Sequence, residues 1–415
     1  MSAAALGSAG SSLQPSRERT IGVLTSLFPT PQRPREGIFA LRRYEALVAR
    51  GHTVILVQPT PRAPWPLGLL APRRYGDLAK RPREEWLGSI YIHRPRYTHL
   101  PSAPLGNAHR FARAGLRQLA VLESMGQRHN GEPLFDIMIA DYAWPAALAA
   151  KRSPELRRPF IVSGRGSDIL QVAEEPDLRP HLAGALRASA GYCAVSQDLV
   201  DAMDELSGAR RGVLVPNGVD GERFHPGPAP ELPGSGPHVL VVGHLIPRKD
   251  PRLALAAFAE LRATQLGAHL HFVGAGPEEE ALRADCTALD LGASVTFHGE
   301  ADPDALADLY RAADVLLLCS TREGRPNVVL EALASGLPVV ATRAGGTEEL
   351  LANTPFDVLG ERTPSAIADA LRATLASAPA PETLRAAVAH LTWQHSTDLL
   401  EDLIEAAIAR TAAPR

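Results

Sequence analysis

The 415-residue sequence contains few cysteines and no long apolar run, and each shortage excludes a class of protein. Its three cysteines, Cys193, Cys286 and Cys319, are scattered and odd in number. They predict buried, reduced thiols, because a disulfide framework or a zinc site needs paired or clustered residues. No apolar stretch approaches the length of a transmembrane helix. Residues 1–19 lack the basic start and apolar core of a signal peptide, so we expect a disordered tail and a cytoplasmic protein.

Charge of one sign and phosphate-binding glycine motifs are also scarce. A formal net charge of -3 gives no bias toward nucleic acid, and we expect no nucleic-acid partner. The G-x-G-x-x-G fingerprint of dinucleotide-binding domains is absent, which weakens a dehydrogenase interpretation. The chain does have 45% hydrophobic and 21% charged residues, a composition typical of globular proteins, and its length favours two domains.

The most informative stretch runs from Val315 to Gly346. Val315–Cys319 is a short, unbroken apolar run that predicts a strand buried on both faces of a parallel sheet. A polar turn follows, and Pro326 then opens a helix that ends at Gly336. In an open parallel sheet, ligands bind outside the carboxyl ends of the strands, which is where this turn and the start of this helix fall.

Two carboxylates and the start of a helix converge on this expected crevice. Glu323 lies in the turn, while Asn327 and Glu331 are four residues apart and share one face of the helix. The free N–H groups of Asn327 and Val328 lie at the positive end of the helix dipole and suit a phosphate or sugar oxygen. The structural alternative makes Glu323 a helix cap and Glu331 a solvated charge.

The residues at 322–332, R-E-G-R-P-N-V-V-L-E-A, resemble the E-x7-E motif of retaining glycosyltransferases, and in particular glycosyltransferase family 4. The resemblance implies an α/β protein of the GT-B fold, with two Rossmann-like domains facing a central cleft. It also implies retaining transfer of a sugar from a nucleotide-sugar to an acceptor hydroxyl, in the synthesis of a cell-surface glycan or glycolipid. The expected parts are a tail at 1–19, an acceptor-side domain at 20–225, a linker at 226–237, a nucleotide-sugar-binding domain at 238–391, and a helix at 392–411 that crosses back to the first domain.

A second match is the loop H-L-I-P-R-K-D at 244–250, which follows a strand and Gly243. It resembles the family loop that binds the donor diphosphate, and Lys249 matches the lysine of that loop. His244 stands where many members carry arginine, and Asp250 stands where glycine is usual. Arg248 is the candidate to compensate. The alternative is a pair of basic surface residues before a helix.

Two N-terminal motifs also match. P-R-E-G-I-F, which contains Gly37, resembles the first loop of family 4 enzymes, which in those enzymes lies under the acceptor and the donor phosphates. Gly164–Asp168 looks like the family's H-G-S-D turn, with Arg165 where many members carry histidine. Arginine cannot act as a base at neutral pH, but it can bind a phosphate. Asp168 either caps the helix that follows or holds Arg165, and the cap is the simpler structural explanation.

The resemblance implies a role for each matched residue. Glu323, Arg165 and Lys249 are the implied catalytic residues, and Glu331 is expected to accept hydrogen bonds from both ribose hydroxyls. The implied donor site is Gly243, His244, Arg248, Lys249, Glu323, Asn327, Val328 and Glu331, and Gly37 and Asp168 lie on the acceptor side. No metal ion or other cofactor is expected. Asp302-Pro303-Asp304 has the form of a metal-binding D-x-D motif, but we interpret it as the start of a helix.

The implied partners are a nucleotide-sugar donor and a glycan or lipid-linked acceptor. Pro59–Leu87 combines apolar and basic residues, which indicates either a peripheral contact with the inner face of the membrane or a long surface excursion. Two other functions stay open. A nucleotide-sugar epimerase of the same architecture would form product from the donor alone. A non-catalytic nucleotide-sugar-binding protein would bind the donor and never release nucleotide, and the departures at His244 and Arg165 would then mark lost activity.

Overall fold

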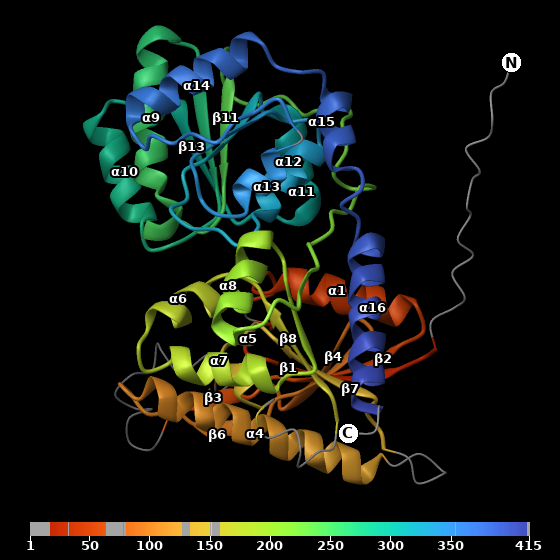
Figure 1. Cartoon of the computed structure of the whole chain (residues 1–415). Helices are drawn as coiled ribbons and strands as arrows, with labels where there is room; N and C mark the ends of the chain where they lie inside the picture. Colours follow the sequence, from red (N-terminus) through yellow and green to blue (C-terminus); the bar gives the residue numbers. More distant parts are fainter. Residues whose placement is uncertain are drawn as a thin grey trace, which may run out of the picture.

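The computed structural model describes residues 17–31, 33–63, 78, 80–126, 133–149, 151, 158–352 and 354–412. These residues form two lobes, each built on a mainly parallel sheet with helices on both faces (Figure 1). The expected α/β class is therefore confirmed. Residues 1–16 of the expected tail and residues 64–77 and 79 of the apolar and basic segment lie outside the described residues.

The N-terminal lobe contains an eight-stranded sheet in the order β10-β9-β8-β7-β1-β2-β5-β4, in which only β4 at the edge is antiparallel to its neighbour. Its strands are β1 (Thr20–Thr25), β2 (Thr53–Val57), β4 (Glu84–Leu87), β5 (Ile90–His93), β7 (Ile137–Asp141), β8 (Phe160–Gly164), β9 (Gly191–Ala194) and β10 (Gly212–Leu214). A separate parallel pair joins β3 (Thr60–Arg62) to β6 (Arg96–Thr98).

Three of the six helices described in this lobe begin within three residues of the carboxyl end of a strand. They are α1 (Ile38–Ala49), α4 (Pro104–Met125), α5 (Ala143–Ala146), α6 (Ser167–Glu174), α7 (Arg179–Ala188) and α8 (Gln197–Ser207). Gly37 precedes α1 with a φ of 77°, a left-handed conformation that favours glycine. A β-carbon at that position would lie 3.0 Å from the Leu27 carbonyl oxygen, so the loop after β1 closes tightly on itself.

The C-terminal lobe contains a five-stranded parallel sheet in the order β13-β12-β11-β14-β15. Its strands are β11 (His238–Val242), β12 (His269–Val273), β13 (Val295–Gly299), β14 (Val315–Leu318) and β15 (Val339–Ala341). Its helices are α9 (Pro251–Thr264), α10 (Glu279–Ala288), α11 (Pro303–Ala312), α12 (Asn327–Ala334), α13 (Thr347–Leu351), α14 (Pro364–Ala376) and α15 (Pro381–Val388), with 3-10 turns η2 (Pro247–Lys249) and η3 (Gly292–Ser294).

Strand β14 shows why the strands of this lobe consist of short runs of apolar residues. All four of its residues are buried, because hydrophobic clusters cover both faces of the sheet. Leu316 and Leu318 belong to the cluster beneath α11 and α12, while Val315 and Leu317 belong to the cluster beneath α9 and α14. The expected extension to Cys319 lies one residue beyond the observed strand, although that side chain is buried too. Cys193, Cys286 and Cys319 are all buried and free, as expected.

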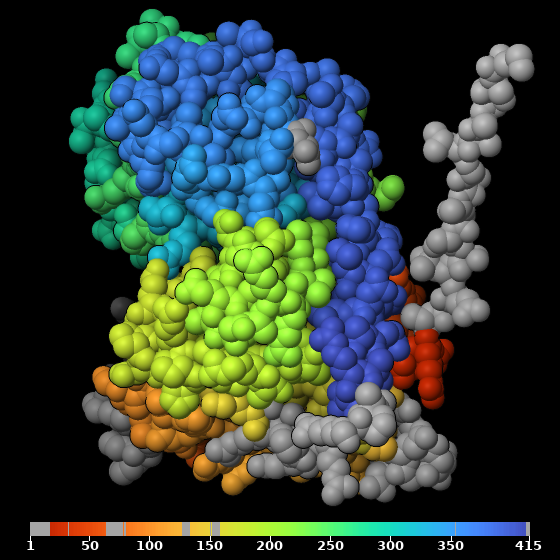
Figure 2. Space-filling view, in the orientation of Figure 1, coloured from red at the N-terminus to blue at the C-terminus, as the bar shows by residue number. Residues whose placement is uncertain are grey.

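The last helix, α16 (Trp393–Ala412), leaves the C-terminal lobe and lies along the N-terminal lobe (Figures 1 and 2). Leu400, Leu403 and Ile404 are buried in the same cluster as residues of β1, β2 and α1. Arg50 and Glu401 form an ion pair at 3.0 Å across this contact. Among the residues described, no helix combines the length and the apolar character needed to cross a bilayer.

Two segments connect the lobes and lie side by side. Val219 forms a parallel bridge with Thr392, and its N–H donates to the Leu391 carbonyl oxygen at 2.9 Å. Gly218 packs so closely on Trp393 that a β-carbon would lie 2.2 Å from the Trp393 nitrogen. The two paired segments therefore form a double connection between the lobes.

Candidate functional site

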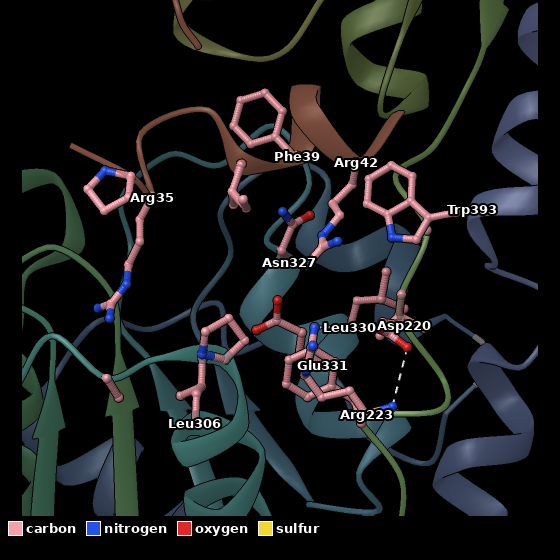
Figure 3. Close-up of a pocket in the computed structure, with 17 residues that line it drawn as sticks. Arg35, Phe39, Arg42, Asp220, Arg223, Leu306, Asn327, Leu330, Glu331 and Trp393 are labelled. Carbon is pink, nitrogen blue, oxygen red and sulfur yellow. Dashed lines mark hydrogen bonds and ion pairs between the residues drawn. The ribbon is translucent and has the colours of Figure 1, made fainter. Parts of the chain in front are cut away.

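A cavity of about 400 Å³ lies between the two lobes (Figure 3). The N-terminal lobe supplies one wall through α1 and the loop before it, and the C-terminal lobe supplies the opposite wall through α12 and the start of α11. The double connection closes one side. The lining residues that Figure 3 labels are Arg35, Phe39, Arg42, Asp220, Arg223, Leu306, Asn327, Leu330, Glu331 and Trp393.

Helix α12 directs Asn327 and Glu331 into this cavity (Figure 3). Pro326 occupies the N-cap position and the helix starts at Asn327, one residue after the expected start. The N–H groups of Asn327 and Val328 belong to the first turn, where a helix offers them no carbonyl partner. The expected placement of Asn327 and Glu331 on one helix face is thus observed, with an open helix start beside them.

Glu331 is half-buried at the cavity wall, and its carboxylate accepts a hydrogen bond from the Tyr310 hydroxyl at 3.0 Å. Burial raises the pKa of Glu331 to about 7, against the opposing effect of that hydrogen bond. The side chain is therefore not the solvated charge of the structural alternative. Its free carboxylate oxygen remains available to accept hydrogen bonds from hydroxyl groups in the cavity.

Glu323 lies in the turn before α12 and is 9% exposed. Its carboxylate pairs with the Lys249 ammonium at 2.6 Å and with the Arg248 guanidinium at 3.6 Å. Arg248 also donates to the Arg322 carbonyl oxygen at 2.7 Å. Glu323 does not cap α12, because its carboxylate pairs with these cations and no side-chain cap bond is present at the start of this helix. The structure brings together two motifs that lie 74 residues apart.

The structure explains one of the two departures noted in the loop around Lys249, the aspartate at position 250. Asp250 has a φ of 48°, the left-handed conformation in which glycine is usual, and aspartate is one of the residues that tolerate it. Its carboxylate pairs with Arg362 at 2.7 Å and accepts from the Leu253 N–H at the start of α9. His244 is exposed to solvent. Gly243 lies against Gly274, where a β-carbon would come within 2.1 Å of the Gly243 carbonyl oxygen.

Arg165 is almost completely buried and already has protein partners. Its guanidinium forms a two-pronged ion pair with Asp141 at 2.9 and 3.2 Å and donates to the Asn217 side-chain oxygen at 3.0 Å. Burial opposes ionisation, but Asp141 raises the pKa of Arg165 above its usual value. The Asn217 amide in turn donates to the Asn327 side-chain oxygen at 3.0 Å. A polar chain therefore runs from the N-terminal lobe to the start of α12.

Of the two roles expected for Asp168, the structure shows contact with Arg165, through the Arg165 backbone, and no cap on the helix. It is the second residue of α6, whose N-cap is Gly166, and no side-chain cap bond is present. Its carboxylate instead accepts the backbone N–H groups of Arg165 at 3.0 Å, Gly166 at 2.7 Å and Ala143 at 2.5 Å. The cap interpretation was wrong, because the carboxylate points back into the turn before the helix. It fixes the backbone of Arg165 and not its guanidinium.

The D-x-D segment is the start of a helix, as expected. Asp302 is the N-cap of α11 and accepts the N–H groups of Asp304 and Ala305 at 3.1 and 2.9 Å. Asp304 pairs with Arg223 at 2.7 Å. Within the described part of the chain, no three His, Cys, Asp or Glu residues are grouped so as to hold a metal ion.

Several residues of the site were not identified from the sequence. Asp141, Asn217 and Tyr310 each bind a residue that was identified. The sequence did offer an indication for Asp141, because a carboxylate at the carboxyl end of a buried strand lies where ligands bind. Tyr310 carried none, because its contact with Glu331 depends on how α11 packs on α12. Trp393 at the cavity wall depends on the path of the chain between the lobes.

Two family models match this chain and together span most of it. The model described as Glycosyltransferase Family 4 matches residues 37–223, and the model described as Glycosyl transferases group 1 matches residues 228–390. TuaC of Bacillus subtilis, named as a teichuronic acid biosynthesis glycosyltransferase, is 28% identical over 366 residues, which cover 84% of this chain and 87% of TuaC. A GDP-mannose-dependent alpha-(1-6)-phosphatidylinositol monomannoside mannosyltransferase of Mycobacterium tuberculosis is 35% identical over 175 residues, which cover 38% of this chain and 45% of that protein.

Solved structures share the same two-lobed arrangement. A sucrose-phosphate synthase from Thermosynechococcus elongatus has a TM-score of 0.67 at 19% identity, covering 95% of this chain and 97% of its own. HepE of Anabaena, solved in complex with UDP, has a TM-score of 0.65 at 18% identity, covering 93% of this chain and 99% of its own. At this level of identity the likeness concerns the fold, and it confirms the expected GT-B arrangement of two Rossmann-like domains.

Proposed function

Because this chain belongs to glycosyltransferase family 4, we propose that it transfers a sugar from a nucleotide-sugar donor to an acceptor hydroxyl and retains the configuration of the anomeric carbon. The observation that carries this proposal is the pairing of Glu323 with Lys249 at 2.6 Å beside the start of α12. It joins the two motifs that would bind the sugar and the diphosphate of one donor. In this proposal the donor lies along α12, with its ribose at Glu331.

Glu331 is suited to bind the ribose because it lines the cavity and shares only one oxygen with Tyr310. A carboxylate can accept hydrogen bonds from two adjacent hydroxyl groups, which would orient the nucleoside. Leu306, Leu330 and Phe39 line the same cavity and provide the apolar surface that a base needs. The helix start at Asn327 and Val328 then lies where the phosphates would follow.

The departing diphosphate develops negative charge that fixed positive groups must stabilise. Lys249 and Arg248 are the nearest cations to Glu323, and Lys249 would exchange part of its pairing with Glu323 for a phosphate oxygen. Glu323 would then hold hydroxyl groups of the donor sugar and face the anomeric carbon. We propose that these side chains act without a metal ion. Attack on the same face, assisted by the leaving phosphate, accounts for retention.

Arg165 contributes differently from Lys249 in this proposal. Its guanidinium is committed to Asp141 and Asn217, so it would stabilise the diphosphate through its charge and through the hydrogen-bonded chain to Asn327. Three of its five N–H groups make these hydrogen bonds, and Arg165 is not among the residues that line the cavity. We therefore place Arg165 as a residue that orients α12 toward the donor.

The relatives suggest the kind of acceptor. One is named for teichuronic acid synthesis and another for a phosphatidylinositol mannoside, so we propose a glycan or lipid-linked acceptor. The acceptor would bind on the N-terminal side of the cleft, near Gly37 and Asp168. Arg113 and Arg117 are exposed on α4 of this lobe, which fits a peripheral contact with anionic lipid.

The test is an assay with a panel of UDP-, GDP- and ADP-sugars and candidate acceptors, in buffer that contains EDTA. Proton NMR of the first-formed product should show an α-linked sugar from an α-linked donor. A β-linked product would refute retention, and activity that returns only with magnesium or manganese would refute the metal-free mechanism. Product from the donor without acceptor would indicate an epimerase.

A further inference from the structure

Glu349 belongs to the C-terminal lobe but caps a helix of the N-terminal lobe. One of its carboxylate oxygens accepts the N–H groups of Gln197 at 2.5 Å and Asp198 at 3.2 Å, the first two residues of α8. The other oxygen accepts from the Arg325 guanidinium at 3.2 Å. Figure 1 shows α8 at the edge of the N-terminal lobe that faces α13, the helix that carries Glu349. One side chain therefore ties α8 to the turn that holds Glu323.

Ser196, the residue that would ordinarily cap α8, does not do so. It occupies the N-cap position with an extended backbone, but its side chain makes no cap bond. Its hydroxyl is buried and has no hydrogen-bond partner. Serine is a preferred capping residue, and a buried hydroxyl without a hydrogen bond is unfavourable. The absence of a cap bond from Ser196 therefore needs an explanation. The Glu349 carboxylate supplies it by occupying the N–H groups at the start of α8.

The backbones of the two lobes meet at glycines beside this contact. A β-carbon on Gly324 would lie 2.2 Å from the Arg165 carbonyl oxygen. A β-carbon on Gly346 would lie 1.9 Å from the Gly324 carbonyl oxygen and 3.0 Å from the Ser196 β-carbon. The contacts of Gly324 with Arg165 and of Gly346 with Ser196 cross between the lobes and are close, so they form only when the lobes are closed. Capping by Glu349 and docking of the turn at Gly324 therefore occur together.

We propose that Glu349 is a positioning residue that holds the lobes closed and, through Arg325, fixes the turn that carries Glu323. The inference rests on the proposed function, since sugar transfer requires both lobes to meet around the donor. When the lobes separate, the N–H groups of α8 lose Glu349, and the Ser196 hydroxyl takes over as the cap. In the closed form Glu349 caps α8, and in the open form Ser196 caps it, so the start of α8 has one defined state in each form.

Other ion pairs between the lobes are less suited to this role. Arg322 pairs with Glu174 at 2.7 Å and Arg35 pairs with Glu300 at 3.6 Å, but all four side chains are more than a third exposed. Exposed pairs contribute little, because water solvates the separated charges nearly as well. The Arg325 side chain is 7% exposed and the Glu349 side chain 23% exposed. Their contact also lies at the positive end of the α8 dipole, which favours a carboxylate.

The test compares Glu349→Ala and Glu349→Gln with the control Glu348→Ala. Glu348 is the adjacent residue and pairs with Arg343 at 3.0 Å within the C-terminal lobe. Small-angle X-ray scattering, with and without whichever of UDP, GDP or ADP stabilises the protein, measures closure. We expect Glu349→Ala to keep a larger radius of gyration with nucleotide and to lower kcat about 10-fold or more, because the closed state becomes a minority. Glu349→Gln should be intermediate, and the control should match the wild type.

A second variant tests the exchange of caps. Ser196→Ala should leave the melting temperature and kcat of the wild type nearly unchanged, because the hydroxyl makes no bond in the closed state. In the Glu349→Ala background the same change should lower the melting temperature further, because α8 then has no cap in either state. Equal effects of Ser196→Ala in both backgrounds would overturn the exchange.

The readouts separate closure from donor binding. The dissociation constant of the nucleoside diphosphate should change less than about threefold in Glu349→Ala, because Glu349 acts on closure and not on the nucleotide. A loss of nucleotide affinity as large as the loss of kcat would place Glu349 in the donor site and overturn the proposal, as would wild-type scattering in Glu349→Ala. If the wild type transfers no sugar, the proposed function fails, and the scattering of Glu349→Ala and Glu348→Ala still decides whether Glu349 holds the lobes closed.

Discussion

Lys249 offers the sharpest test of how the two central motifs work together. The change is Lys249→Met, which keeps an apolar stem of similar length and removes the ammonium that lies 2.6 Å from Glu323. Two separate consequences follow from the structure. The carboxylate of Glu323, only 9% exposed, loses its nearest cation, and the proposed diphosphate site loses a positive charge.

The stability effect can be bounded from the geometry. Removing one partner of a fully buried ion pair costs about 3–5 kcal/mol. Here Lys249 is 17% exposed and Arg248 remains 3.6 Å from the other oxygen of Glu323, so we expect about 1–2 kcal/mol. Nucleotide binding should weaken about 10- to 100-fold, since one charge-assisted hydrogen bond contributes about 1.5–3 kcal/mol.

A double-mutant cycle with Glu323→Gln separates the two effects. Chemical denaturation should show that Lys249→Met costs less than about 0.5 kcal/mol once Glu323 carries no charge. Calorimetric titration with a nucleoside diphosphate should show the same 10- to 100-fold loss of affinity in both backgrounds. If the loss of affinity disappears with Glu323→Gln, Lys249 acts only by holding Glu323, and the assignment of the diphosphate loop is refuted.

Three further predictions concern ionisable groups whose state the structure sets. Burial raises the pKa of Glu331 to about 7, and ribose hydroxyls bind best to the ionised carboxylate, so the affinity for a nucleoside should rise by up to about 10-fold between pH 6 and pH 8; calorimetry should show this rise in the wild type and not in Glu331→Gln. Asp141→Asn should cost about 3 kcal/mol or more in chemical denaturation, because it leaves the Arg165 guanidinium buried without its anion; a loss below about 1 kcal/mol would contradict this account of the pair. Burial, assisted by His269, His298 and His238, lowers the pKa of His271 to about 3. Its contribution to stability is therefore complete above pH 6.5 and lost as the pH falls toward 3, which amounts to about 2 kcal/mol by pH 5; His271→Leu should flatten this acid slope, and an unchanged slope would exclude His271 as its source.

The parts of the site that the sequence predicted are those that local pattern and motif spacing define. The placement of Asn327 and Glu331 on one helix face follows from helical geometry, and the cap at Asp302 follows from hydrogen bonding within four residues. The loop at Lys249 was identified because its residues resemble a known motif. For these features no knowledge of tertiary packing was needed.

The parts that the sequence did not predict depend on contacts between distant segments. Arg165 pairs with Asp141 because β7 and β8 are neighbours in the sheet, and nothing in either segment alone specifies that pairing. Asp168 was expected either to cap a helix or to hold Arg165, but its carboxylate accepts three N–H groups, one of them 25 residues away at Ala143. The link from Glu349 to α8 forms only when two lobes meet, so no pattern within one lobe could reveal it.

The packing of α16 against the N-terminal lobe determines the order in which the two lobes can finish folding during synthesis. Ribosomal synthesis delivers β1, β2 and α1 first, yet the apolar surface they share is completed by Leu400, Leu403 and Ile404 near the very end of the chain. Domains usually fold as units during synthesis, with the N-terminal unit first. Here part of the core of the N-terminal lobe stays open to solvent after β10 has been synthesised, until about 180 further residues have emerged and α16 can pack on it. At about 5–20 residues per second this takes roughly 10–40 seconds. The sheet and covering helices of the C-terminal lobe end at α15, so this lobe needs no later segment. It can therefore complete its folding before the N-terminal lobe does. A stop codon or fused domain placed before Trp393 would thus damage the beginning of the protein rather than its end.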